Sequence, residues 1–183
     1  PVVVLSICVG NVCRSPLAER LLSVRTTGTG GRVVFESAGI RGLSGHEMER
    51  SAARELRRLG GNESGFVARR VSAEMLAGAD LILAMTREVR AEVLKEYPRA
   101  MRRTFTLREF AHLCRFAVEV DAAIFSVAEL VSFAALNRSQ AAAIDQDVPD
   151  PIGRSDEVHR QAADLIAANV DVISALLSPL LRD

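Results

Sequence analysis

The chain opens with VVVLSI at residues 2–7 and continues directly into CVGNVCRSP at residues 8–16. The first run is β-branched and lacks polar alternation, which is typical of a strand covered on both faces in a parallel sheet. In the second run, Pro16 suits the first turn of a helix, and apolar residues follow it at helical spacing. The stretch therefore predicts a central strand, a tight loop and a helix.

The same alternation continues along the chain. We expect strands at residues 33–36, 80–85 and 104–107, helices at 47–59, 87–97, 108–116 and 158–177, and one or two helices within 124–144. Strands that alternate with helices predict an α/β fold with a parallel sheet. A polar loop rich in Asp and Pro, residues 145–153, separates the last two helical regions.

Length and composition predict one domain over residues 1–183. The chain has 183 residues, 49% of them hydrophobic, which is enough for one buried core. Lys plus Arg equals Asp plus Glu, 23 each, so the whole molecule has no electrostatic reason to bind nucleic acid or an anionic membrane. We expect a monomer or weak dimer, and any preference for phosphate must come from a local site.

The cysteines favour a reducing compartment. Three are present, Cys8, Cys13 and Cys114, an odd number that does not suggest a disulfide framework. The sequence starts on a strand-like run instead of a signal peptide, and even the apolar segment 118–136 carries three acidic residues. We expect no membrane-spanning segment and a cytoplasmic protein.

The loop at residues 8–16 has the features of an anion site. It lies between a strand and a helix N-terminus, where unpaired amides and the helix dipole favour a phosphate. In that positive potential the pKa of Cys8 should fall from about 8.5 into the ~3.5–7.5 range of activated thiols. Arg14 can bind two phosphate oxygens at once, and Ser15 can donate a hydrogen bond to the thiolate.

Simpler explanations exist for these residues. A lone cysteine at the position of Cys8 would usually be a small apolar residue that ends a buried strand. Cys8 and Cys13 have poor spacing for zinc without a second pair or a nearby histidine, so we expect no metal. The three histidines, His46, His112 and His159, have no ligand spacing and are given no chemical role.

Residues 8–16 resemble the signature of the low-molecular-weight protein tyrosine phosphatases. The resemblance includes the Cys-x5-Arg-Ser loop with its internal Gly-Asn and second Cys, the following Ala18-Glu19, and Asp150-Pro151. Segments 37–39, 68–69 and the strand that begins at Asp80 are also similar, so the likeness covers most of the chain. It implies a three-layer α/β sandwich with a four-stranded parallel sheet, and phosphomonoester hydrolysis, mainly of protein phosphotyrosine, without cofactor or metal.

The resemblance also implies a role for each residue of the site. Cys8 would attack phosphorus to form a phosphocysteine, and Asp150 would protonate the leaving oxygen and then activate water. Asp145 and Asp147 lie close to Asp150, but only Asp150 precedes proline. Cys13 would be a redox partner of Cys8. The phosphate would be bound by the loop residues Val9, Gly10, Asn11, Val12, Cys13, Arg14 and Ser15.

The sequence departs from the family in two places. Members that prefer phosphotyrosine carry aromatic cleft residues, whereas this chain has IRGLS at residues 40–44 and Ile152-Gly153, leaving Leu43 and Ile152 for apolar contact. The segment at about 115–144 is longer than a minimal member needs. It is either an extra helix that completes the core or a lid or partner surface beside the cleft.

Two other functions remain open. A thioredoxin-coupled arsenate reductase would have the same fold, but it needs further redox cysteines, and after the strand at 80–85 this chain has none until Cys114. A catalytically inactive phosphate-binding or regulatory module would usually lack at least one of Cys8, Arg14 and Asp150, and all three are present.

Overall fold

The computed structural model describes residues 1–182, and its elements follow the predicted alternation. In chain order they are β1 (Val2–Cys8), α1 (Arg14–Arg25), β2 (Val33–Gly39), α2 (Arg50–Arg58), α3 (Ala73–Gly78), β3 (Leu81–Ala84), α4 (Arg87–Glu96), η1 (Pro98–Arg103), β4 (Thr104–Thr106), α5 (Leu107–Glu119), α6 (Val127–Leu136), η2 (Arg138–Ala141) and α7 (Asp156–Leu180).

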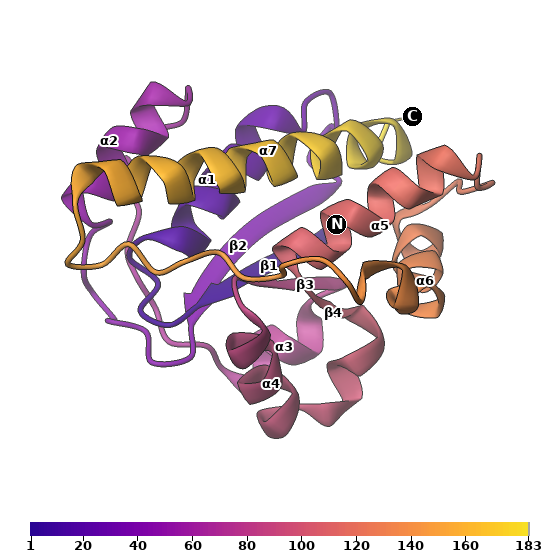
Figure 1. The fold of residues 1–183 in the computed structure, drawn as a ribbon, viewed down its shortest axis with the longest axis horizontal. Helices are drawn as coiled ribbons and strands as arrows, with labels where there is room; N and C mark the ends of the chain where they lie inside the picture. Colours follow the sequence, from indigo (N-terminus) through magenta and orange to yellow (C-terminus); the bar gives the residue numbers. More distant parts are fainter. Residues whose placement is uncertain (183) are drawn as a thin grey trace.

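The four strands form one parallel sheet in the order β2-β1-β3-β4. Ser6 of β1 pairs with Ser37 on one side and Leu83 on the other, so β1 is central, as its apolar run predicted. Helices α1, α5 and α7 cover one face of the sheet, and α3 and α4 cover the other (Figure 1). The predicted three-layer sandwich is confirmed.

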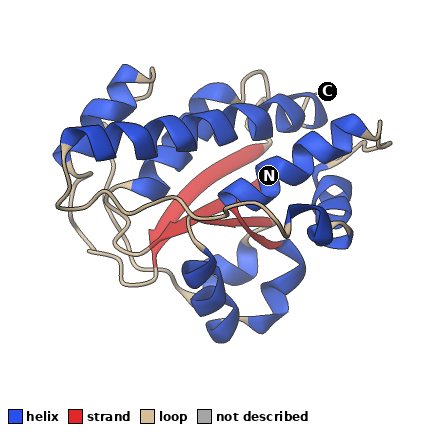
Figure 2. Cartoon of the chain, in the orientation of Figure 1, coloured by secondary structure: helices blue, strands red, loops and turns tan. Residues whose placement is uncertain are grey.

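The period of two along β1 explains why the strand is apolar except at Ser6. Leu5 and Ile7 pack in the cluster that contains α3 and α4, whereas Val4 and Cys8 pack in the cluster that contains α1, α5 and α7. Alternate side chains therefore enter different cores, which is why both faces of the strand are mainly apolar. Cys8 is the last residue of β1, at the carboxyl end of the sheet, where many loops gather (Figure 2).

The predicted boundary of α2 was wrong. The helix begins at Arg50 and not at residue 47, because the Glu49 side chain caps it by accepting a 2.9 Å hydrogen bond from the Ala52 amide. Two short elements, α3 and η1, were not predicted. With six residues each, they show too little periodicity to be recognised in the sequence.

The helices predicted within 124–144 are α6 and η2. Val127, Leu130, Val131 and Ala134 of α6 are buried in the main core. Helix α6 lies beside Val2 and Asp80 at the amino ends of β1 and β3, with which Val127 and Val131 share a pocket. Cys8 is at the opposite end of β1, so this position favours a core helix over a lid.

Helix α7 is the one helix among residues 1–182 that is long and apolar enough to cross a membrane, judged by length and composition only. Within its 25 residues, one 18-residue window has a mean hydropathy of 1.5. Half of that apolar window is buried against the rest of the molecule. Its wide apolar stripe follows from its position, because α7 packs against α1, α2 and α5 (Figure 1).

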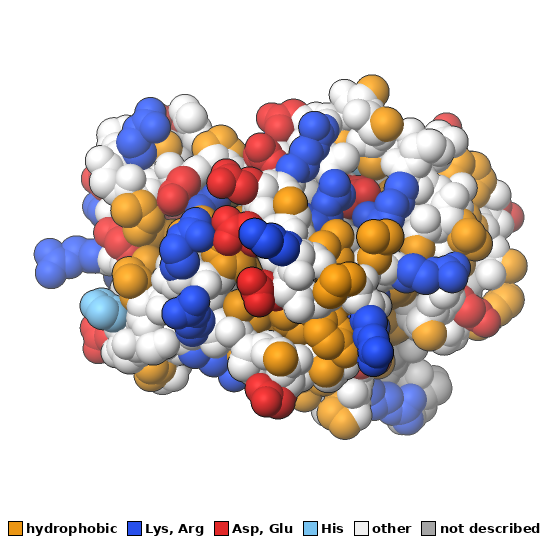
Figure 3. All heavy atoms as spheres, turned by 90° about the horizontal axis from the view of Figure 1, so that it is seen from below, with side chains coloured by type: hydrophobic (Ala, Val, Ile, Leu, Met, Phe, Trp, Pro, Cys, Tyr) orange, Lys and Arg blue, Asp and Glu red, His pale blue; other side chains and the backbone are white. Residues whose placement is uncertain are grey.

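Charges of both signs are mixed on the face that Figure 3 shows, with hydrophobic side chains between them. This agrees with the balanced composition, 23 basic and 23 acidic residues. A surface with interspersed charges produces no extended potential of one sign.

Candidate active site

In the loop after β1, most backbone carbonyls point outward and accept hydrogen bonds from segment 40–49. The carbonyls of residues 8, 9, 10 and 12 accept hydrogen bonds of 2.8–3.0 Å from the amides of Ile40, Arg41, Leu43 and Glu49 respectively. Since the C=O and the next N–H of a planar trans peptide point in opposite directions, the following amides face away from segment 40–49, toward the space enclosed by the loop. Such inward amides form an anion-binding cradle.

The Cys8 thiol lies inside this cradle. Its Sγ is 3.0 Å from Ser15 Oγ and accepts a 3.3 Å hydrogen bond from the Asn11 amide. Ser15 Oγ also lies 3.3 Å from the Ala38 carbonyl and receives a hydrogen bond from Asn11 Nδ2. The single Ser15 proton can go either to the Ala38 carbonyl or to the closer Cys8 sulfur, and donation to the sulfur is what the sequence suggested.

Asn11 uses every polar atom of its side chain to fix the loop. Nδ2 donates to Ser15 Oγ and Ser37 Oγ, both at 2.9 Å, and Oδ1 accepts a 2.8 Å bond from the Arg69 amide. Its φ of 57° is left-handed, a conformation that asparagine tolerates better than most residues. Ser37 Oγ in turn donates to Glu19 Oε2, so a buried chain of hydrogen bonds connects Glu19 to the cysteine.

Arg14 is buried at the first position of α1 and reaches the loop that carries Asp150. Nη1 donates to the Val148 carbonyl at 3.0 Å, and Nη2 lies 3.3 Å from Asp150 Oδ2. Its Nε is buried and has no hydrogen-bond partner within residues 1–182. A guanidinium with an unsatisfied buried donor is a ready site for an oxyanion oxygen.

Asp150 completes the site from the far end of the chain. Its Oδ1 accepts a 3.2 Å hydrogen bond from the Ile152 amide, which turns the carboxylate toward Arg14. A pocket of about 330 Å³ lies between these parts, lined by Cys8, Val9, Gly10, Val12, Cys13, Arg14, Arg41, Leu43, Asp150 and Ile152. The structure thus brings together all three residues predicted as catalytic.

Residues 3–123 match the family model described as low molecular weight phosphotyrosine protein phosphatase. This chain belongs to that family. The low molecular weight protein-tyrosine-phosphatase Ptp of Acinetobacter johnsonii is 36% identical over 104 residues, which cover 57% of this chain and 70% of Ptp.

Two other phosphatases match over almost the full chain. The protein-arginine-phosphatase of Geobacillus stearothermophilus is 27% identical over 97% of each chain. The structure of the low molecular weight protein tyrosine phosphatase of T. tengcongensis has a TM-score of 0.74 and 26% identity, and the match covers 97% of this chain and all of that one.

The family match ends before the acidic loop. Asp150 lies beyond residue 123, so its place in the site rests on its distance to Arg14 and on the shared pocket. Of the rival carboxylates, Asp145 accepts a hydrogen bond from the Asp147 amide and forms an ion pair with Arg108, and both contacts lower its pKa. Asp147 accepts the Arg87 amide. Asp145 and Asp147 therefore fix the loop and do not line the pocket.

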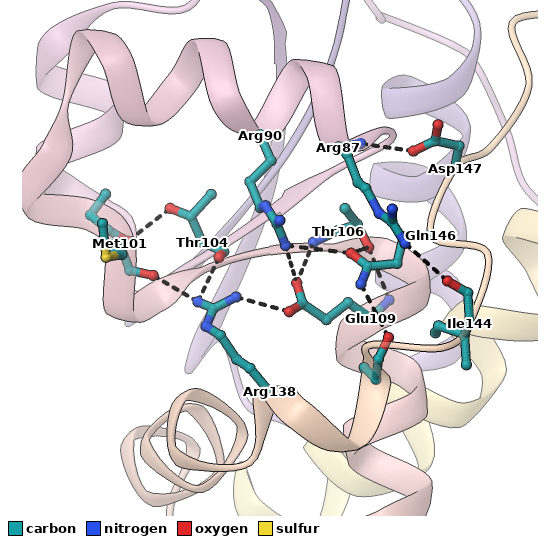
Figure 4. Close-up of polar contacts among 12 residues, drawn as sticks. Arg87, Arg90, Met101, Thr104, Thr106, Glu109, Arg138, Ile144, Gln146 and Asp147 are labelled. Carbon is teal, nitrogen blue, oxygen red and sulfur yellow. Dashed lines mark hydrogen bonds and ion pairs between the residues drawn. The ribbon is translucent and has the colours of Figure 1, made fainter.

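A buried network anchors this loop to the sheet (Figure 4). The loop's Gln146 accepts hydrogen bonds of 3.4 Å from Arg90 and Thr106, and it donates to the Ala141 carbonyl. The Arg87 side chain donates to the Ile144 carbonyl and the Arg108 side chain to the Asp147 carbonyl, while the Arg87 amide donates to the Asp147 carboxylate. Contacts on both sides of Gln146 thus limit the movement of the segment that leads to Asp150.

Glu109 is the centre of that network (Figure 4). Its carboxylate is buried and forms ion pairs with Arg90 at 2.8 Å and Arg138 at 3.0 Å, and it also accepts the Thr106 amide. Arg138 also donates to the Met101 and Thr104 carbonyls. Arg138, from the 115–144 segment, therefore supports the acidic loop: it binds Glu109, which binds Arg90, which binds Gln146 of the loop. The sequence did not reveal this link.

The structure also places Glu49 and His159 beside Cys13, which sequence spacing did not predict. Cys13 Sγ is 4.0 Å from Glu49 Oε2, and His159 Nδ1 is 3.7 Å from the same oxygen. Burial, and next the Glu49 carboxylate, raise the pKa of Cys13 far above its ordinary value. Cys13 is therefore a protonated thiol at neutral pH.

Cys114 is fully buried on α5, and burial raises its pKa to about 12. Such a thiol is neither accessible nor reactive, which removes the remaining cysteine that could relay a disulfide from Cys8 or Cys13.

Proposed function

We propose that this chain hydrolyses phosphate monoesters, with phosphotyrosine in proteins as the substrate class, through a phosphocysteine on Cys8. The observation that carries the proposal is the convergence of Cys8, Arg14 and Asp150 on one pocket beneath the amides of the phosphate loop. The family and its named relatives support the same activity. We further propose that residues 1–183 act as one phosphatase domain.

In the first step, the Cys8 sulfur attacks phosphorus in line with the leaving oxygen. The inward amides, Arg14 Nε and Arg14 Nη2 bind the three non-bridging oxygens, whose charge is stabilised by these fixed donors. Asp150 gives its proton to the leaving oxygen, so the alcohol departs neutral.

In the second step, Asp150 takes a proton from water, which attacks phosphorus and releases Cys8. Ser15 donates a hydrogen bond to the departing sulfur, 3.0 Å away, and makes it a better leaving group. Inorganic phosphate then leaves, and the enzyme returns to its starting state.

A second substrate class is phosphoarginine. One observation favours it: among the relatives that align over almost the full chain, one, at 27% identity over 97% of both chains, is a protein-arginine-phosphatase. In addition, none of the residues lining the pocket, all within the described range, is aromatic, and Leu43 and Ile152 contribute aliphatic side chains to its lining. An aliphatic wall suits the flexible stem of arginine as well as a phenyl ring.

The test is hydrolysis of an aryl phosphate with a chelator present throughout, comparing wild type with Cys8→Ser and Asp150→Asn. Turnover that is lost in Cys8→Ser and severely slowed in Asp150→Asn supports the mechanism. Vanadate binding without turnover by the wild type would show an inactive phosphate-binding module instead. Peptides with phosphotyrosine or phosphoarginine, compared by kcat/KM, then decide the substrate class.

A further inference from the structure

A mixed cluster of side chains lies beside the active-site loop and has no role in the mechanism above. Cys13 comes from the loop, Glu49 from the N-cap of α2, and His159 from the second turn of α7. One atom of each, Sγ, a carboxylate oxygen and an imidazole nitrogen, lies within 4.8 Å of the other two. Glu49 lies 36 positions after Cys13 and 110 positions before His159, so the fold brings together residues that are far apart in sequence.

The three groups lie close together but make no strong hydrogen bond with one another, since the contact from Cys13 Sγ to Glu49 is a weak S–H···O bond at 4.0 Å. The Glu49 oxygen is 3.7 Å from His159 Nδ1, which is too long for a hydrogen bond, and 4.0 Å from Cys13 Sγ. In a tetrahedral zinc site, bond lengths of about 2.0–2.3 Å separate neighbouring ligand atoms by about 3.3–3.6 Å. The two Glu49 distances exceed these separations by a few tenths of an ångström, and all three atoms lie within 4.8 Å of one another, so the cluster would contract around a bound cation.

The chemical types also fit a zinc-like cation. Thiolate sulfur, imidazole nitrogen and carboxylate oxygen are its three usual protein ligands. Cys13 and His159 are only 3% and 5% exposed, so they are held by packing, whereas Glu49 is partly exposed and gives access from solvent. The charges of a thiolate and a carboxylate cancel those of a divalent ion.

We propose that Cys13, Glu49 and His159 bind a thiophilic divalent cation of the Zn²⁺ class, and that this cation inhibits the phosphatase. The cation takes the place of the Cys13 thiol proton, which leaves to solvent, and water fills the fourth position. Inhibition rests on the proposed function. It follows because Cys13 lines the pocket and the Glu49 amide binds the Val12 carbonyl at 2.8 Å, so the two sites share the phosphate loop.

Binding is tested without reference to catalysis, by titrating the reduced protein with Co²⁺ in a phosphine reductant. The expected result is one equivalent of Co²⁺ with a thiolate charge-transfer band that survives in Cys8→Ser and is lost in Cys13→Ser. His159→Gln should weaken binding at least about tenfold, since even the outer partners of a metal ligand contribute that much. Glu49→Gln keeps a carbonyl for the Ala52 amide and serves as a second variant.

Two results would overturn the site. One is the absence of the band, and the other is a band that depends on Cys8 and is indifferent to His159 and Glu49. His112→Gln is the matched control, because this histidine lies on α5 and outside the cluster. It should bind Co²⁺ like the wild type.

Inhibition is measured separately, as the Zn²⁺ concentration that halves aryl phosphate hydrolysis. The expected result is a value at least about tenfold higher in His159→Gln than in the wild type and in His112→Gln. Equal values in all three would overturn the inhibitory role. If no form of the protein turns over, the proposed phosphatase function fails, while the Co²⁺ result still decides the cation site.

Discussion

Asp150 Oδ2 lies 3.3 Å from Arg14 Nη2, so the candidate acid and the candidate phosphate-binding guanidinium contact each other directly. A substrate phosphoryl group must enter between this pair and Cys8, where Arg14 exchanges part of its contact with Asp150 for phosphate oxygens. The carboxylate is then next to the leaving oxygen, held by the Ile152 amide. The pair therefore links binding of the phosphoryl group to placement of the acid.

Asp150→Asn should lower kcat by about 10²- to 10⁴-fold, the usual contribution of a general acid. The loss should be greater for phenyl phosphate than for 4-nitrophenyl phosphate, because nitrophenolate leaves more readily without a proton. Steady-state kinetics with both substrates provide the measurement. Asp147→Asn is the control, since asparagine keeps an acceptor for the Arg87 amide, and it should stay within a few-fold of wild type.

Asn11→Asp should lower kcat/KM by about 10- to 100-fold, although the shape of the side chain is unchanged. The carboxylate can no longer donate to Ser15 or Ser37, and both hydroxyls would turn to donate to it. The Cys8 sulfur would then lose a charge-assisted hydrogen bond worth about 1.5–3 kcal/mol. Asn62→Asp, an exposed substitution in a turn, is the control. Equal activity of Asn11→Asp and wild type would contradict this role of Asn11.

Glu109→Gln should destabilise the protein by about 3 kcal/mol, because it leaves the Arg90 and Arg138 guanidiniums without their buried counter-charge. Thermal unfolding should show a decrease in Tm of roughly 6–12 °C for a chain of this size. The ion pair of Arg54 with Asp156 is largely exposed, so Asp156→Asn should shift Tm very little. Similar shifts for both variants would contradict the central place of Glu109.

The parts of the site that lie close together in sequence were predictable. Cys8 and Arg14 stand on one loop whose place between strand and helix fixes their geometry, and Asp150 was recognisable by its proline. Glu49 and His159 were not predictable, because they meet Cys13 only through the packing of α2 and α7. Sequence spacing reveals ligands within one element, but it does not reveal those brought together by tertiary contacts.

Glu19 should make the stability depend on pH. Burial raises its pKa above 4.5, against the opposing hydrogen bond from Ser37. A raised pKa means that the favourable contribution is complete below pH 4.5 and is lost as pH rises through the folded pKa. Glu19→Gln should therefore gain stability relative to wild type between pH 4 and pH 7, measured by urea unfolding at both values.

Glu74→Gln provides a control of opposite sign. Hydrogen bonds at the start of α3 lower the pKa of Glu74, so its contribution is present above pH 4.5 and lost as pH falls through the folded pKa. This variant should lose stability relative to wild type at pH 7 and approach it at low pH. A Glu19→Gln variant that behaves in the same way as Glu74→Gln would contradict the assigned cause.

Ile152→Tyr should shift the preference of the enzyme toward phosphotyrosine. Ile152 lines the pocket together with Leu43 and is about half exposed, so a larger ring can be accommodated there without displacing the core. An aromatic contact with the substrate ring contributes about 0.5–1.5 kcal/mol, or about 2- to 12-fold in kcat/KM. Val67→Tyr, an exposed apolar position outside the pocket, is the control. If the ratio of kcat/KM for phosphotyrosine and phosphoarginine peptides were the same in both variants, Ile152 would not contact the substrate side chain.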